Sequence, residues 1–187
     1  MRLRPVCTIA AAAVLALSLG ACGDKVAKIT HGETEASYLD VGGLKYQVQI
    51  SRALNPRDVE DHGYLIGLGP GDQQLTSQET WFGVFMRVQN PTNQPRPTAS
   101  DYTITDTEGT VFRPLPLTAV NLFAYRPGTL GPSGITPIPG SAPAEGPIQG
   151  SLLLFKIPFA NLENRPLELE IRSPQAPQES ASVALDI

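Results

Sequence analysis

Proline is the feature of this chain that most restricts its fold. The 187 residues include 18 Pro and 17 Gly, and Pro interrupts almost every segment between Pro56 and Pro177. Proline lacks the backbone N–H that an internal helical turn needs, and its ring clashes with the preceding turn. After residue 22, no window carries apolar residues at helical spacing over three turns. The chain beyond this point is therefore predicted to be largely β-structure, without helices.

The hydrophobic pattern predicts several strands. Residues 44–51 and 167–172 alternate between apolar and polar side chains, the pattern of a strand with one buried face. Residues 81–88 are apolar on both faces except for Arg87, which is typical of a central strand covered on both sides. Residues 148–157 form the most apolar run. In the first segment, the side chains expected on the buried face are Leu44, Tyr46, Val48 and Ile50.

The remaining segments complete an all-β domain over residues 38–187. Residues 106–109 read as a hairpin loop with Gly at the left-handed position, and residues 183–187 as an added edge strand. About six to eight strands around one core predict an antiparallel β-sandwich, with a closed barrel as the alternative. Residues 114–147 are rich in Pro, Gly and Ser, and a connection of that length is usually functional or disordered.

The N-terminus has the three parts of a secretory signal, predicted to span residues 1–21. A basic start is followed by an uncharged apolar run over residues 6–19, which is too short to span a bilayer core of about 30 Å. The run ends in Leu-Gly-Ala-Cys, which looks like a bacterial lipobox with Cys22 as the residue that receives a diacylglycerol. An uncleaved membrane anchor and a plain secretory signal are the alternatives.

Lipidation determines the expected compartment and the thiol chemistry. Cys7 would leave with the signal, so Cys22 would be the only Cys of the mature protein and no intramolecular disulfide could form. Two or three acyl chains hold a protein durably in a membrane. Residues 22–37 are predicted to form the lipidated Cys and a flexible tether, which places the domain on the extracytoplasmic side of the cell membrane.

The charge of the mature chain argues against nucleic acid as a partner. Loss of the two signal arginines leaves 12 basic residues against 18 acidic ones, a net charge of −6. The charges are scattered along the sequence, so the chain lacks the basic patch that binding to nucleic acid or to anionic lipid normally uses.

Four segments, taken in order, resemble a family of bacterial immunoglobulin-like extracellular domains of unknown function, often found on lipoproteins. Residues 81–90 match a strand ending in x-V-x-N, and residues 106–109 match a D-x-x-G hairpin. Residues 150–158 match a G-x-L-x-F-x-x-P strand, and residues 167–171 match the last alternating strand. The resemblance covers roughly residues 42–172 and implies an immunoglobulin-like sandwich outside the membrane. It implies no reaction and no catalytic residues.

The candidate chemical sites are weak. The densest group of metal ligands is Asp58, Glu60, Asp61 and His62, but its spacing matches no calcium loop, and His31 lies in the predicted tether. Copper would need more than Met86 and two distant His. Hydrolysis would have to pair His62 with Ser77, without a nucleophile elbow. We expect no metal, no cofactor beyond the lipid on Cys22, and no enzymatic activity.

The pointer to a functional surface is a group of aromatic and basic side chains in the Pro/Gly-rich segment. Apolar residues in such a loop either plug the end of the sandwich or face a partner, and both alternatives stand for Phe123 and Tyr125. We therefore expect a non-catalytic module that binds an envelope protein or polymer through this loop. The alternative is a small-ligand carrier or sensor with an interior cleft beside Trp81. The candidate loop residues are Arg113, Phe123, Tyr125 and Arg126.

Overall fold

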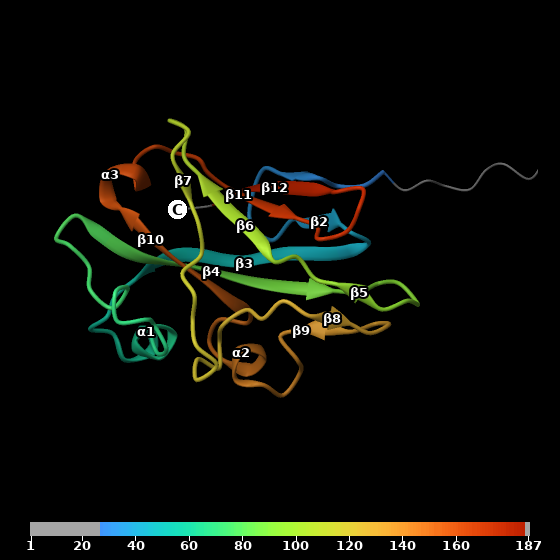
Figure 1. Ribbon diagram of the computed structural model, residues 1–187, viewed down its shortest axis with the longest axis horizontal. Coiled ribbons are helices and arrows are strands. Elements are labelled where there is room, and N and C mark those ends of the chain that lie inside the picture. Colours follow the sequence, from blue (N-terminus) through green and yellow to red (C-terminus); the bar gives the residue numbers. More distant parts are fainter. Residues whose placement is uncertain (1–26, 186–187) are drawn as a thin grey trace, which may run out of the picture.

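The computed structural model describes residues 27–185, which contain twelve strands and three short helices (Figure 1). Seven strands have four or more residues, within the predicted six to eight: β2 (Tyr38–Val41), β3 (Leu44–Leu54), β4 (Glu79–Gln89), β6 (Asp101–Thr105), β10 (Ser151–Pro158), β11 (Leu167–Arg172) and β12 (Ser180–Leu185). The other five have two residues each: β1 (His31–Gly32), β5 (Arg96–Pro97), β7 (Val111–Phe112), β8 (Thr129–Leu130) and β9 (Ile135–Thr136).

The strands form two open sheets packed face to face, so the β-sandwich prediction is confirmed and the closed barrel is not. One sheet has the order β1-β12-β11-β6-β7, and the other has the order β10-β4-β3-β2, with β9 beside β4. Strands β5 and β8 pair separately as a small ribbon. The named pairings are antiparallel except that of β1 with β12, which is parallel.

Alternation along the strands places the main core between the two sheets. Even-numbered residues from Phe82 to Val88 on β4 face this core, as do the odd-numbered residues from Leu153 to Ile157 on β10. The apolar face predicted for residues 167–171 is buried against them, whereas the charged face is not. A strand that alternates in this way can fill one interface and still present its other side to a second layer.

That second layer explains why β4 is apolar on both faces. Trp81 and Phe85 on β4 pack into a separate cluster on the outer side of their sheet, together with Leu152 and Leu154 on β10. The cluster is covered by α1 (Val59–Tyr64) and by the chain around residues 115–123. The prediction of a central strand covered on both sides is confirmed.

The expectation that the chain has no helices is wrong, because three short helices are present. Besides α1, the chain forms α2 (Ala142–Glu145) and α3 (Phe159–Leu162). Helix α1 begins where the Asp58 side chain accepts a hydrogen bond from the Glu60 N–H at 2.9 Å. Single turns of this kind fit between prolines, whereas the three-turn pattern used for the prediction cannot detect them.

A β-bulge corrects the predicted face of β3. The register with β4 shifts between Val48 and Ile50, so Ile50 turns outward and is 37% exposed, while Ser51 is buried. One inserted residue moves every following side chain to the opposite face of the strand. Leu44, Tyr46 and Val48 do share the buried face, as predicted.

The predicted tether is shorter than expected, because its second half belongs to the sandwich. Strand β1 pairs with β12, and Lys28 forms an ion pair with Glu179. The Asp40 N–H donates to the Ile29 carbonyl at 2.7 Å. Strand β12 is consequently not the edge strand that was predicted, because β1 covers it. The predicted signal over residues 1–21 and the lipidation site Cys22 lie outside the described residues.

The long Pro/Gly-rich segment 114–147 is folded against the sandwich. It contains β8, β9 and α2, and two buried Asn side chains hold its ends. The Asn90 amide donates to the carbonyls of Gln94, Leu130 and Gly131 at 2.8–3.0 Å. The Asn121 amide donates to the carbonyls of Tyr64 and Ile66. In residues 27–185, no helix has the length and apolar character needed to cross a membrane.

Candidate functional site

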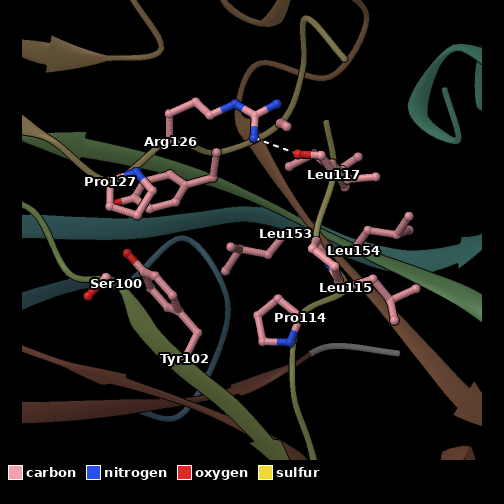
Figure 2. A pocket seen from close by; sticks show the side chains of 13 residues that line it. Ser100, Tyr102, Pro114, Leu115, Leu117, Arg126, Pro127, Leu153 and Leu154 are labelled. Atoms are coloured by element: carbon pink, nitrogen blue, oxygen red, sulfur yellow. Dashed lines mark hydrogen bonds between the residues drawn. The ribbon is translucent and has the colours of Figure 1, made fainter. Parts of the chain in front are cut away.

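A pocket of about 300 Å³ lies on the side of the sandwich where β10 and β6 are bridged by the long segment (Figure 2). Most of its lining residues are apolar, with Tyr102 and Leu153 near the core and Arg126 at the rim. The segment crosses the β10 edge twice, before and after residues 118–123. The complete lining consists of Ser100, Tyr102, Pro114, Leu115, Pro116, Leu117, Ala124, Tyr125, Arg126, Pro127, Leu152, Leu153 and Leu154.

Backbone hydrogen bonds fix these walls to β10. The Leu115 N–H donates to the Leu154 carbonyl at 2.6 Å. Leu152 is bonded on both sides, since its N–H donates to the Phe123 carbonyl at 2.7 Å and its carbonyl accepts from the Tyr125 N–H at 2.8 Å. The long segment thus pairs with β10 through one parallel bridge, between Ala124 and Leu152, and then diverges from the sheet. A site built on strand edges in this way is preformed rather than dependent on a mobile loop.

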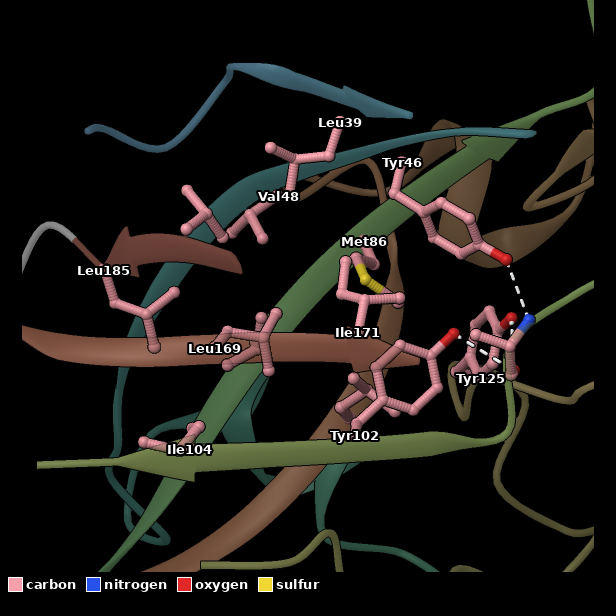
Figure 3. Packing of buried hydrophobic residues seen from close by; sticks show 14 of the residues in the cluster. Leu39, Tyr46, Val48, Met86, Tyr102, Ile104, Tyr125, Leu169, Ile171 and Leu185 are labelled. Atoms are coloured by element: carbon pink, nitrogen blue, oxygen red, sulfur yellow. Dashed lines mark hydrogen bonds between the residues drawn. The ribbon is translucent and has the colours of Figure 1, made fainter. Parts of the chain in front are cut away.

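Three tyrosine hydroxyls converge on the backbone of one buried residue, Ala99, and hold the pocket from the core side (Figure 3). The Ala99 N–H donates to the Tyr46 hydroxyl at 2.7 Å. The Ala99 carbonyl accepts from Tyr102 at 3.1 Å and from Tyr125 at 3.0 Å. The rings of Tyr102 and Tyr125 meet edge to face with centroids 5.3 Å apart. We call Ala99 and these three residues the tyrosine clamp.

Burial keeps the phenols of the tyrosine clamp protonated. Desolvation raises the pKa of Tyr46, Tyr102 and Tyr125 above the usual value, because the ionised form would lose its hydration. The pocket lining also contains no carboxylate and no imidazole within residues 27–185. The pocket therefore offers apolar surface, hydroxyl groups and one guanidinium.

The mouth of the pocket carries one uncompensated positive charge, that of Arg126. The Arg126 guanidinium is exposed and donates to the carbonyls of Leu117 (2.7 Å) and Thr118, and it forms no ion pair within residues 27–185. Arg113 does not line the pocket but lies next to it in sequence, where it pairs with Asp101 at 3.1 Å. Of this pair of arginines, only Arg126 has its charge uncompensated by a carboxylate.

The two predicted loop aromatics point inward. Tyr125 is 6% exposed, and Phe123 is half-buried with its ring 4.8 Å from that of Tyr64, at an interplanar angle of 80°. Both rings pack inward, which agrees with the alternative that they fill the sandwich, although they lie at its side and the prediction placed them at its end. Arg113 and Arg126 are exposed. The pattern of the sequence could not identify Ser100, Tyr102 or the β10 leucines as pocket residues, because only the fold brings them to the segment 114–127.

Trp81, beside which an interior cleft was expected, does not line the pocket described above. Trp81 is 6% exposed and packed in the outer cluster, where its indole N–H donates to the Asp72 carbonyl at 3.4 Å. The pocket described above is lined by Tyr102 and Tyr125 instead. Trp81 therefore belongs to the packed core.

The acidic group near α1 has structural roles. Asp58 caps the helix, and Asp61 is buried against the Arg52 guanidinium, which donates to it at 2.9 Å, and the Asn55 N–H, which donates at 2.7 Å. Burial alone would raise the Asp61 pKa, but these donors outweigh it and the pKa is lowered. Residues 27–185 bring no three His, Cys, Asp or Glu side chains together as metal ligands.

Asp106 organises the D-x-x-G hairpin. Its carboxylate accepts from the amide of Asn161 at 2.8 Å and that of Asn164 at 3.1 Å. It also accepts from the N–H groups of Glu108 and Thr110. These donors, with Asn161 the strongest, lower its pKa to about 2. Gly109 has the left-handed conformation that was predicted, with φ = 84°.

The fold is a two-sheet β-sandwich with a lateral pocket, and its architecture is similar to that of solved bacterial proteins. The yjhA protein of Bacillus subtilis superposes with a TM-score of 0.55 at 11% identity, over 82% of this chain and 99% of that one. A functionally unknown protein of Listeria monocytogenes EGD-e gives 0.50 at 9% identity, over 83% and 84%. An uncharacterized β-sandwich protein of Clostridium difficile 630 gives 0.42 at 8% identity, over 83% and 95%.

No protein-family model and no curated protein matches the sequence. At identities near 10%, similarity to solved structures shows the fold alone. The resemblance predicted from the sequence therefore holds for the β-sandwich, and the function has to be argued from this chain's own residues.

Proposed function

We propose that this protein is a lipid-anchored, non-catalytic binding module of the cell envelope, and that the pocket beside the tyrosine clamp receives its partner. The anchor is the diacylglycerol expected on Cys22, which leaves the sandwich on the extracytoplasmic side. The observation that carries the proposal is the preformed pocket, whose apolar walls are pinned to β10 and whose rim bears the unpaired charge of Arg126.

The chemistry of the walls favours an extended segment of another envelope protein. Three prolines, Pro114, Pro116 and Pro127, and the ring of Tyr125 give a rigid apolar surface that loses little conformational entropy on binding. Arg126 would pair with a carboxylate of the same segment, because its guanidinium is exposed and lacks an acidic partner in the described chain. Such a segment would place one or two apolar side chains in the pocket.

A small-ligand carrier is the second candidate, and the pocket volume favours it. About 300 Å³ is at the lower end of the range for small-molecule sites, which begins near 300 Å³. A carrier would bind its ligand without a protein partner. The two functions therefore separate in a cross-linking experiment, since a carrier gives no protein adduct at the pocket.

The test uses a photo-cross-linking amino acid in place of the exposed Pro116, in cells that express the full-length protein. We expect one dominant protein adduct, reduced at least roughly fivefold by Ser100→Trp, which fills the mouth, and by Arg126→Glu. The matched control is Arg57→Glu, the same charge reversal at an exposed Arg outside the pocket. No adduct, or an adduct that Ser100→Trp leaves unchanged, would contradict the proposal of a protein partner at this pocket.

A further inference from the structure

The Arg96 side chain is a partly buried cation that forms no ion pair within residues 27–185. The side-chain Nε of Arg96 is buried and has no hydrogen-bond partner within residues 27–185, and no ion pair to its guanidinium forms there. A buried N–H of a charged group that stays unsatisfied costs on the order of 1–3 kcal/mol or more. A buried polar group without a partner calls for an explanation, and a bound ion is one of them.

The guanidinium lines a pocket of about 290 Å³ at one end of the sandwich. The pocket is formed by the β2–β3 turn, by residues 173–179 between β11 and β12, and by Lys28. The turn consists of Gly42 and Gly43, both with positive φ. A Cβ on Gly43 would lie 3.4 Å from the Arg96 Nε, so the absence of a side chain at that position leaves room for the guanidinium.

The charges at this pocket favour an anion. Glu179 is the one carboxylate in its lining within the described residues, and it is already engaged by the Lys28 ammonium and by the Gly42 N–H at 2.9 Å. The hydrogen bond from Lys28 is the main reason that the pKa of Glu179 is lowered. With Glu179 neutralised by Lys28, the charge of Arg96 remains.

The position of the pocket identifies where such an anion would come from. Lys28 lines it, and Lys28 lies only six residues after Cys22. Because residues 28–37 belong to the sandwich, at most about 20 Å of extended chain separates Lys28 from a lipidated Cys22. A lipid anchor on Cys22 therefore keeps this end of the sandwich within about 20 Å of the lipid that Cys22 carries.

We propose that the Arg96 pocket binds the phosphate of a membrane phospholipid headgroup and so orients the anchored sandwich on the bilayer. This proposal rests on the lipid anchor of the proposed function. The terminal N–H groups of a guanidinium can donate charge-assisted hydrogen bonds to a phosphate oxygen. The anchor supplies a high effective concentration of headgroups, so the pocket does not need high intrinsic affinity.

Amide hydrogen exchange on the lipidated protein tests the orientation. In phosphatidylglycerol vesicles, we expect exchange of the amides of Gly42, Gly43, Gln175, Ala176 and Gln178 to be roughly tenfold slower than in dodecyl maltoside micelles, which carry no phosphate. Arg96→Gln removes this protection, Arg96→Lys restores part of it, and the matched control Arg57→Gln retains all of it. Equal exchange in vesicles and micelles, or protection that survives Arg96→Gln, would overturn the proposal.

Two further arms separate the sources of failure. Inorganic phosphate added to the micelles should not reproduce the protection; if it does, the site takes free phosphate and the assignment to a headgroup is wrong. Soluble dihexanoyl phosphatidylglycerol is titrated into the unlipidated Cys22→Ser protein, where we expect chemical-shift changes at residues 42–43 that Arg96→Gln abolishes. Binding in this arm together with an unlipidated wild-type protein would refute the anchor while leaving the pocket intact, whereas no binding here refutes the pocket by itself.

Discussion

The tyrosine clamp gives the sharpest prediction, because its two donors share one acceptor. In the double variant Tyr102→Phe/Tyr125→Phe, the buried Ala99 carbonyl loses both hydroxyl donors, whereas each single variant leaves it one. Both substitutions remove only a hydroxyl and keep the ring in the core. The energetic consequence is therefore carried by hydrogen bonding rather than by a cavity.

The magnitudes follow from what remains satisfied. Each single variant should lower the free energy of unfolding by about 0.5–1.5 kcal/mol, the net value of one hydrogen bond. The double variant should lose more than the sum by about 1 kcal/mol or more, since a buried carbonyl without a partner costs about 1–3 kcal/mol. Tyr46→Phe leaves the Ala99 N–H unsatisfied at once, so that single variant should cost about 1–3 kcal/mol.

Equilibrium unfolding in urea, followed by the fluorescence of the single Trp81, measures these differences. The matched control is Tyr38→Phe, because Tyr38 is 46% exposed and its change should be close to zero. Additive losses in the Tyr102/Tyr125 double variant would refute the shared-acceptor geometry. A Tyr46→Phe variant as stable as the Tyr38→Phe control would refute the role of Ala99.

Three other perturbations test separate parts of the fold. The pKa of Asp106 is lowered to about 2, so the stability that its carboxylate contributes is present above pH 3.8, the pKa in the unfolded chain, and is lost as the pH falls from 3.8 through about 2. Asp106→Asn should flatten the pH dependence of the urea midpoint between these two pH values. Gly150→Ala should lower the free energy of unfolding by about 1–3 kcal/mol, because the added Cβ would lie 2.9 Å from the β4 backbone. The readout is a shift of the urea unfolding midpoint to a lower concentration. Arg52→Ala leaves the buried Asp61 carboxylate without its ion pair and should cost about 2–4 kcal/mol in the same assay, with Arg57→Ala unchanged.

The sequence predicted the sandwich because two local signals agree. Proline spacing excludes long helices, and alternation with period two identifies strands such as β11 directly from its letters. The double-sided strand β4 was also predictable, since a strand apolar on both faces needs a layer on each side.

The errors come from features that have no local pattern. The bulge after Val48 moves Ile50 to the surface, and its cause lies in the pairing with β4 rather than in the residues themselves. Residues 28–37 are polar and read as a tether, yet backbone pairing of β1 with β12 holds them in place. Hydrogen bonds between main chains are independent of side-chain pattern, so composition cannot reveal them.

The candidate site was predicted in part. The sequence pointed to Arg113, Phe123, Tyr125 and Arg126 as a partner-binding loop; Tyr125 and Arg126 line the pocket, whereas Arg113 and Phe123 do not. Its depth depends on Tyr102 and Leu153, which come from two different sheets and meet only in the folded chain. Arg96 gave no signal at all, because an unpaired guanidinium is defined by the absence of neighbours in space.

The most direct test of the central claim is the intact mass of the protein extracted from the membrane fraction, wild type beside Cys22→Ser. The account predicts a mature chain that begins at Cys22 and carries the added mass of a diacylglycerol, with membrane association lost in Cys22→Ser. A wild-type chain without lipid, recovered from the medium in the same amount as the variant, would contradict it.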